Sequence, residues 1–280
     1  MFAGFLMVTL AAASWGTWSL FLRPTGLPPT VTSPIIFAVM GLVTLPFALR
    51  LPKVTWDRKL VGLLMLNVAF DALNLVTFFA AIDITTVAIA VLSHYVAPIM
   101  IALVAPRIDG VTVPGARPAA AVALVGLVIV LEPWSEPAHG AALGATIGVI
   151  SAVCYTGNMF VVRRLAVRIG AARAMSYHSL IAAVLLLPLL FLGEGTAAIA
   201  REDVLLLAAG ALTIGAGSGV MFAIGLTRIG SARAAVFVFA EPLVAVAVGA
   251  LVWEEALHPL AAIGGLMVLG AGIHVAHKAR

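Results

Sequence analysis

The chain has 280 residues, of which 63% are hydrophobic and only 10% are charged, and its mean hydropathy is +1.16. Soluble domains carry about 25% charged residues, so this composition excludes a soluble globular protein and predicts an integral membrane protein. The net charge is +4, but the basic residues are concentrated in loops between apolar segments, which indicates membrane topology and not nucleic-acid binding.

Apolar stretches long enough to cross a bilayer as helices, about 17–25 residues each, follow one another along almost the whole chain. We predict ten spans, at residues 3–22, 31–50, 59–81, 86–106, 114–131, 139–162, 173–192, 203–227, 233–252 and 258–276. The loops between them are short, which leaves no room for a soluble catalytic domain. The predicted fold class is an all-α integral membrane protein with ten transmembrane helices.

The Lys and Arg residues alternate between crowded and nearly empty loops. With the N-terminus in the cytoplasm, almost all of them fall in cytoplasmic loops or in the C-terminal tail, and the outer loops hold only Arg23 and Arg201. Basic residues on short loops resist translocation across the membrane. This asymmetry predicts a multi-pass protein with both termini in the cytoplasm.

The third span carries a polar stripe. Four residues recur at i, i+4, i+7 and i+11, which places them on one helical face: Asn67, Asp71, Asn74 and Phe78. Asp71 would lie near mid-depth, where an ionisable group costs at least ~2.5 kcal/mol and therefore needs a reason. The stripe either lines a wet cavity that holds a substrate ammonium group or a proton, or forms an interhelical hydrogen-bond seam worth about 0.6 kcal/mol per contact.

Aromatic residues also occur inside predicted spans and not only at the membrane interfaces, where tyrosine and tryptophan usually collect. They and their polar neighbours are Trp15, Trp18, His94, Tyr95, Tyr155 and Asn158. Such a group would wall a cavity for an apolar or aromatic side chain, or hold an ammonium group by cation–π attraction of ~0.5–2 kcal/mol. Ordinary core packing is the alternative for each member. His178 is predicted to lie at shallow depth in the seventh span and to make a local hydrogen bond.

Two prolines lie at matching depth in the fourth and ninth spans. Pro98 and Pro242 each remove a backbone hydrogen bond and are expected to break the helix, which makes them candidate gating hinges. Glu241, directly before the second proline, is either a proton carrier or a structural acceptor at the break. In the eighth span, the small residues between Gly210 and Gly219 either permit close helix packing or open room for a ligand.

The two halves of the chain repeat. Residues 78–131 align with residues 222–275 at a constant offset of 144, and an offset of 140 aligns earlier positions. Each half holds five spans, an odd number, so the second half enters the membrane from the opposite side. We predict two domains, 1–135 and 136–280, related as inverted repeats, an architecture typical of secondary transporters. The aligned pairs include Phe78 with Phe222, Pro98 with Pro242, Gly126 with Gly270, Arg23 with Arg163, Asp71 with Gly215 and Asn74 with Ser218.

Several segments of the second half resemble the EamA-type repeat of the drug/metabolite transporter superfamily. These segments are Phe239-Ala240-Glu241-Pro242, Trp253-Glu254-Glu255, Gly264-Gly265 and Gly270-Ala271-Gly272. The first half carries a weaker copy in His94-Tyr95-Val96-Ala97-Pro98 and Gly126. Within the superfamily the chain looks most like the YddG-type exporters of aromatic amino acids. One departure is that Glu241 aligns with Ala97, so this carboxylate is not duplicated.

The resemblance implies a ten-helix bundle around a central cavity, in the bacterial inner (cytoplasmic) membrane, that moves small metabolites outward. The predicted function is export of aromatic or other apolar amino acids by alternating access. A broad-specificity drug/metabolite exporter is the alternative within transport. An intramembrane enzyme is the alternative from another class, but no nucleophile, metal set or phosphate-loop motif accompanies the buried carboxylates. We therefore expect no enzyme activity, cofactor or metal, and as partners only the small-molecule substrate and the lipid bilayer.

The sequence also assigns candidate site residues. Asp71, with Asn67 and Asn74, is expected to bind the ammonium group of the substrate. No Lys or Arg lies in the middle of a span, so a partner for the substrate carboxylate is not evident. The predicted substrate-binding residues are Asn67, Asp71, Asn74, Phe78, His94, Tyr95, Trp15, Trp18, Tyr155, Asn158 and Ser218, and the predicted hinge residues are Pro98, Pro242 and Glu241.

Overall fold

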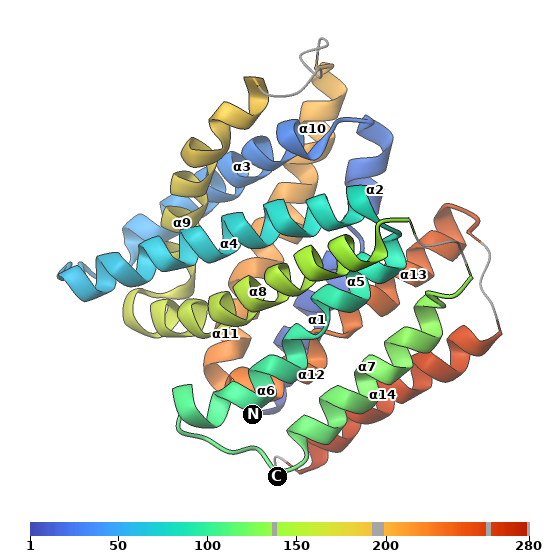
Figure 1. The fold of residues 1–280 in the computed structure, drawn as a ribbon. Coiled ribbons are helices and arrows are strands. Elements are labelled where there is room, and N and C mark those ends of the chain that lie inside the picture. The colour runs from blue at the N-terminus through green and yellow to red at the C-terminus, as the bar shows by residue number, and fades with distance from the viewer. Residues whose placement is uncertain (136–138, 192–198, 256–258, 279–280) are drawn as a thin grey trace.

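The computed structural model of the chain describes residues 1–135, 139–191, 199–255 and 259–278, and these ranges contain helices and no strand. Nine described segments are long and apolar enough to span a membrane, and Ala116–Leu131 is a shorter apolar helix, about 24 Å long at 1.5 Å per residue. The predicted all-α fold with ten spans is therefore confirmed. The two termini lie close together at one end of the bundle (Figure 1). The predicted domain boundary at residue 136 and the predicted span ends at residues 192 and 258 lie outside the described residues.

The first five spans are built from seven α-helices and one short 3-10 helix. Side-chain caps start two of them: Asp57 accepts from the backbone N–H of Leu60 at 2.6 Å, and Thr86 accepts from Ile89 at 3.3 Å. In chain order the elements are α1 (Phe2–Trp15), α2 (Ser19–Leu22), η1 (Arg23–Thr25), α3 (Pro29–Arg50), α4 (Arg58–Ile84), α5 (Val87–His94), α6 (Ala97–Ile108) and α7 (Ala116–Leu131).

The second five spans contain seven further α-helices, a 3-10 helix and one π-helix. Glycines at positive φ, Gly170 and Gly230, make the tight connections before α9 and α12. The elements are α8 (Ala141–Ile169), α9 (Ala171–Leu186), η2 (Leu187–Phe191), α10 (Arg201–Gly210), the π-helix η3 (Ala211–Gly217), α11 (Ser218–Ile229), α12 (Ser231–Phe237), α13 (Ala240–Val252) and α14 (Leu260–His277).

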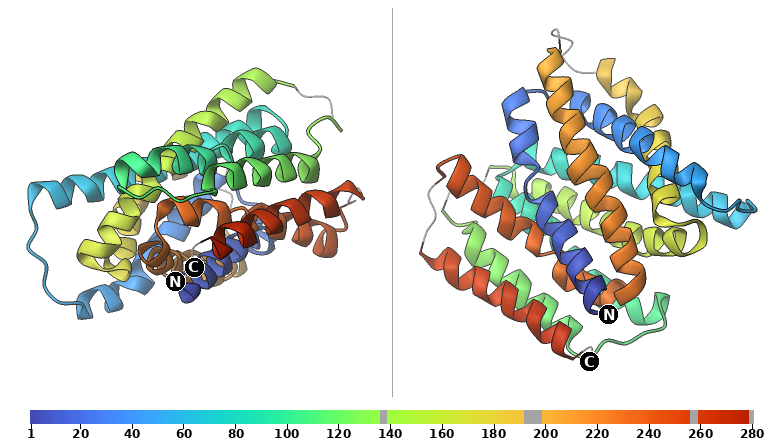
Figure 2. Two further views of the ribbon diagram at one scale, coloured as in Figure 1. Left: turned by 90° about the horizontal axis from the view of Figure 1, so that it is seen from below. Right: turned by 180° about the vertical axis from the view of Figure 1, so that it is seen from behind.

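The helices pack as expected for inverted repeats. Helix α3 packs along α9 and α7 along α14, so the second and fifth spans of one half each contact their counterpart in the other. Helix α4 packs along α8, and α1 packs along α11. The α4–α8 and α1–α11 contacts are equivalent under the repeat, because it relates the third span to the eighth and the sixth span to the first. Figure 2 shows the paired helices from two further sides.

Both predicted proline breaks are present. The fourth span is interrupted at residues 95–96, between α5 and α6, and the ninth at residues 238–239, between α12 and α13. Pro98 and Pro242 follow these interruptions within the first turn of the new helix. Because Pro242 has no N–H, the carbonyl of Val238 accepts instead from Glu241 at 3.1 Å. The breaks are thus a direct consequence of the missing donors.

The first span contains a break that the sequence did not predict. Helix α1 ends at Trp15, and a turn through Gly16 leads into α2, with the N–H of Trp18 donating to the carbonyl of Trp15 at 3.1 Å. A Cβ on Gly16 would lie 2.8 Å from the backbone nitrogen of Ala245 in α13. Glycine therefore lets the broken first span press against the second part of the broken ninth span.

Polar contacts join the loops at one end of the bundle, which we call the basic end. Arg163 pairs with Asp109 at 3.1 Å, and Arg168 pairs with Asp57 at 3.3 Å. Arg173 is buried and donates to the carbonyl of Leu51 at 2.9 Å. These contacts connect the segments after the second and fourth spans to the last turns of the sixth span and the first turn of the seventh.

Candidate functional site

A cavity of about 410 Å³ lies between the two halves, bounded by helices of spans one, two, three, six, seven, eight and nine. Its size falls in the range of small-molecule sites, about 300–1,000 Å³. A second cavity of about 460 Å³ lies between α1, α12, α13 and α14, but its wall is almost wholly apolar. The central cavity is the better candidate site because ionisable and aromatic side chains meet there.

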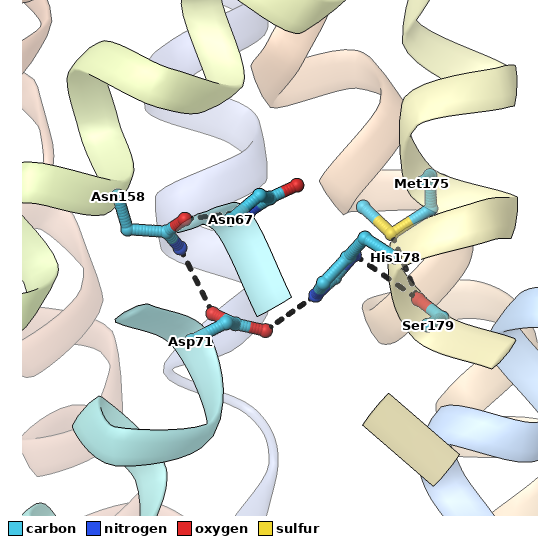
Figure 3. A network of polar contacts seen from close by, with 6 residues as sticks. All are labelled: Asn67, Asp71, Asn158, Met175, His178 and Ser179. Atoms are coloured by element: carbon cyan, nitrogen blue, oxygen red, sulfur yellow. Dashed lines mark hydrogen bonds and ion pairs between the residues drawn. The ribbon is translucent and has the colours of Figure 1, made fainter. Parts of the chain in front are cut away.

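A chain of hydrogen bonds runs along one wall of the central cavity (Figure 3). Asn67 of α4 donates to Asn158 of α8 at 2.6 Å, and Asn158 donates to Asp71 Oδ1 at 2.9 Å. The other carboxylate oxygen of Asp71 lies 2.6 Å from Nε2 of His178 on α9. Asp71 thus stands between an amide and an imidazole, and both of its oxygens have partners. The stripe is therefore a hydrogen-bonded seam between helices that also forms part of the cavity wall.

A second group of polar contacts holds the outer part of the stripe. The hydroxyl of Ser151 on α8 donates to Oδ1 of Asn74 at 2.8 Å and lies 2.9 Å from Nδ1 of His94. His94 is buried and packs against the rings of Phe78, at 4.8 Å, and Tyr155, at 5.2 Å. His94 therefore lies behind the cavity wall and supports it, while Asn74, Phe78 and Tyr155 face the cavity.

Another part of the cavity lining is aromatic and rich in methionine. Trp15, at the end of α1, packs against Phe222 of α11 with ring centroids 4.8 Å apart, and Trp18 follows in the turn of the first span. Met40 and Met175 fill the space that Gly215 and Gly219 leave open, since a Cβ on either glycine would lie too close to the methionine side chains. The small residues of the eighth span thus serve close packing at the edge of the cavity.

Glu241 brings a second carboxylate to the cavity from the start of α13. Its side chain interacts with the hydroxyl groups of Tyr95 and Tyr155. Tyr155 also interacts electrostatically with Asp71. The carboxylates are consequently set in different surroundings, one beside an imidazole and one beside phenols.

The structure brings most of the predicted residues together. Those that line the cavity are Trp15, Trp18, Asn67, Asp71, Asn74, Phe78, Tyr155, Asn158 and Glu241. Their side chains come from spans one, three, six and nine. The four members of the predicted stripe are all among them, as expected for residues on one helical face.

Five predicted residues do not line the cavity. His94 and Tyr95 are buried at the end of α5 and just after it, where they pack behind the wall. Ser218 is buried at the end of the π-helix, and the wider turn of that helix directs Gly215 and Gly219 to the cavity in its place. Pro98 and Pro242 are buried at the helix breaks.

His178 is the residue that the sequence analysis undervalued. It does make the expected local contact, with Ser179 at 3.4 Å, but it also lines the cavity and pairs with Asp71. The signal that would have found it is the buried carboxylate itself, because an ionised group inside the membrane requires a hydrogen-bonding or charged partner. His178 is one of the few side chains within the spans that can supply both.

Comparisons with known proteins agree with this architecture. Residues 142–275 match the EamA-like transporter family, and this range includes the motifs of the second half that suggested it. An uncharacterized transporter of Archaeoglobus fulgidus is 29% identical over 97% of this chain and 95% of its own length. The pseudopaline exporter CntI of Pseudomonas aeruginosa is 24% identical over 73% of this chain and 72% of its own.

A solved crystal structure has the same fold. It is 20% identical, covers 96% of this chain and 95% of its own, and superposes with a TM-score of 0.81. The family match and the two relatives thus point to a transporter, and the solved structure shows the fold. The second half of this chain matches the EamA-like transporter family.

Proposed function

We propose that this protein exports amino acids with aromatic or other apolar side chains, by alternating access to the central cavity. One observation carries the proposal: within the membrane-spanning helices, the lining of the cavity is divided between a polar group around Asp71 and aromatic and methionine side chains. An amino acid has the same division, with charged groups at one end and an apolar side chain at the other. A cavity of about 410 Å³ has room for such a molecule.

The charges of the cavity favour a cargo that carries an ammonium group. Asp71 and Glu241 both line it, and among the described residues no Lys or Arg does. The rings of Trp15 and Phe222 add faces to which a cation is attracted. Strongly anionic cargo, such as a sugar phosphate, would meet two carboxylates and no fixed cation.

The direction and location of transport belong to the proposal as well. The basic loops support a cytoplasmic position for both termini, and the termini lie at the same end of the bundle (Figure 1). We place the chain in the inner membrane of a bacterium as a multi-pass protein. The relative in Pseudomonas aeruginosa is named an exporter, which supports outward movement of a metabolite.

The two halves, residues 1–135 and 136–280, would act as the moving units. The interruptions before Pro98 and Pro242 lie in repeat-related spans, and the second adjoins Glu241 at the cavity. Bending at these two places would open the cavity to one side and then to the other. We assign Pro98, Pro242 and Glu241 to the hinges on this basis. The protein is a carrier in this proposal and has no enzymatic step.

A broad-specificity drug/metabolite exporter is the second candidate, and the largely apolar wall of the cavity favours it. Such a protein would depend on the aromatic wall and little on the polar one. The variant Asp71→Asn separates the two, because it keeps the shape of the side chain and removes the charge. An amino acid carrier loses transport in this variant, and a hydrophobic-drug exporter retains most of it.

Counterflow into proteoliposomes tests the proposal directly. Vesicles preloaded with phenylalanine are given labelled phenylalanine outside, together with unlabelled amino acids or cationic drugs. Saturable uptake that aromatic and large apolar amino acids block is the expected result. Uptake no faster than in empty liposomes, with protein shown to be folded, would refute the aromatic amino acid as cargo and favour the second candidate.

A further inference from the structure

The contact between Asp71 and His178 joins the third and seventh spans at the cavity wall. Oδ2 of Asp71 lies 2.6 Å from Nε2 of His178, while Oδ1 is occupied by Asn158. Side-chain exposure is 23% for Asp71 and 8% for His178, and both residues line the cavity. The pair is therefore sheltered from bulk water but open to a molecule inside the cavity.

The imidazole is held in one orientation from its other sides. The ring of Phe37 meets it edge-on, with centroids 5.7 Å apart and planes at 90°, and Nδ1 faces the hydroxyl of Ser179 at 3.4 Å. An ionised carboxylate only accepts hydrogen bonds, so Nε2 of His178 carries the proton in its contact with Asp71. A donor is thus aimed along the wall at the position where Asp71 now lies.

We propose that Asp71 and His178 together bind the two charged groups of an α-amino acid, Asp71 the ammonium group and His178 the carboxylate. This inference rests on the proposed function. It identifies a partner for the substrate carboxylate, which is not evident from the sequence. Asp71 and His178 contact each other in the structure. When an amino acid enters, its ammonium group replaces His178 at Asp71, and its carboxylate replaces Asp71 at His178.

This exchange leaves no charged group without a partner in either state. Desolvated charges are costly unless they are paired, so an exchange of two contacts for two is the arrangement that keeps both states accessible. A simple amine at Asp71 would leave His178 without its acceptor. A simple carboxylic acid at His178 would leave Asp71 with Asn158 alone. The pair therefore selects zwitterions over either single-charge analogue.

Counterflow with three competitors of matched side chain tests this selection. Phenylalanine, phenethylamine and 3-phenylpropionate share the benzyl group and differ in their charges. For the wild type, phenylalanine is expected to compete with labelled phenylalanine at least about tenfold better than either analogue, the effect of one charged hydrogen bond. Equal competition by phenylalanine and phenethylamine would overturn the role of His178.

The variant His178→Gln tests the assignment residue by residue. It should lower the apparent affinity for phenylalanine about tenfold and change the apparent affinity for phenethylamine by no more than about twofold. The preference for the zwitterion over the amine therefore disappears. Equal weakening of both ligands would mean that His178 only supports Asp71, and would overturn the proposal. His277→Gln, an exposed histidine outside the cavity, is the matched control and should leave the ratio unchanged.

Binding can be followed even where a variant does not transport. Each of the three ligands can be tested for its ability to raise the unfolding temperature of the purified protein, an effect that requires binding alone. The ratios of apparent affinity among the three ligands should match those from counterflow. Asp71→Asn should abolish the advantage of phenylalanine over 3-phenylpropionate in this assay. Absence of saturable phenylalanine uptake by the wild type would refute the proposed function. Saturable phenylalanine uptake that phenethylamine and 3-phenylpropionate block as well as phenylalanine does would refute only the Asp71–His178 assignment.

Discussion

Arg23 and Arg163 occupy the same position in the two repeats, and both pair with an acid near the end of a broken span. Arg163 pairs with Asp109, which follows α6, and Asp109 is only 5% exposed. Arg23 pairs with Glu255, which follows α13, and both side chains are about half exposed, at 52% and 50%. The repeat has thus placed equivalent ion pairs at opposite ends of the molecule, in different surroundings.

The difference in surroundings changes what each pair contributes. Asp109 also accepts from the backbone N–H of Ser231 at 3.4 Å, so it links the ends of α6 and α8 to the start of α12. Arg23 instead lies over the ring of Trp253, at 5.3 Å, and stays accessible to water and salt. In the conformation described, the basic end is held by a buried link and the opposite end by an exposed one. Symmetry of the backbone therefore does not imply symmetry of the energetics.

The largest expected effect comes from breaking the buried pair. Asp109→Asn leaves Arg163 without its counter-charge, which costs about 3 kcal/mol, the lower limit for a buried pair, because Arg163 is 28% exposed. For a chain of this size, this corresponds to a fall of about 6–12 °C in the unfolding temperature. The reaction of Cys154, the chain's single and buried cysteine, with a fluorescent maleimide reports unfolding of the purified protein.

The double variant Asp109→Asn with Arg163→Gln is the control for this prediction. It removes both charges, so part of the lost stability should return. If the double variant is less stable than Asp109→Asn alone, the unpaired arginine is not the cause of the loss.

Two repeat-related glycines, Gly126 and Gly270, also differ in their surroundings. A Cβ on Gly126 would lie 2.6 Å from the carbonyl oxygen of Gly264, whereas a Cβ on Gly270 would meet nothing within 4 Å. Gly126→Ala should push α7 away from α14 and cost about 1–3 kcal/mol. Gly270→Ala, the matched control, should stay within about 0.5 kcal/mol of the wild type. Equal unfolding temperatures for the two variants would contradict the close contact at Gly126.

The exposed ion pair should respond much less than its buried counterpart. Glu255→Gln is expected to cost less than about 1 kcal/mol, because water and salt screen two half-exposed charges. The difference between this variant and the wild type should shrink further in 1 M salt. A fall in unfolding temperature as large as that of Asp109→Asn would show that exposure does not separate the two pairs.

The smallest effect is a pH dependence at the basic end. The hydrogen bond from Leu60 lowers the pKa of Asp57 below its ordinary value of 3.8, and Arg168 lowers it further. A lowered pKa in the folded state means that Asp57 stabilises the fold above pH 4 and that this contribution is lost as the pH falls through the lowered value. Asp57→Asn keeps a helix cap but loses the ion pair, so its deficit should vanish once the pH falls below that lowered pKa. A deficit that persists there would contradict the assignment.

Much of the fold could be predicted because it depends on local sequence. The apolar length of each span, the two prolines and the odd number of spans per half are all visible in the chain, and each has one structural consequence. The stripe of Asn67, Asp71, Asn74 and Phe78 was predictable for the same reason, since helical periodicity alone puts these residues on one face. The break after Trp15 was not, because it depends on how closely Gly16 approaches α13.

The ten spans, the inverted repeat and the face of the third span that carries the ionisable group all follow from the order of the residues along the chain. Which residues meet that group depends instead on how the helices pack. Asp71 and His178 are separated by 107 positions, and no periodicity connects them. Their contact exists because the third and seventh spans pack on each other, and the depth and rotation of each helix depend on all of its neighbours at once. Helical periodicity determines which side chains share a face of a helix, and helix packing determines which residues of other helices those side chains contact.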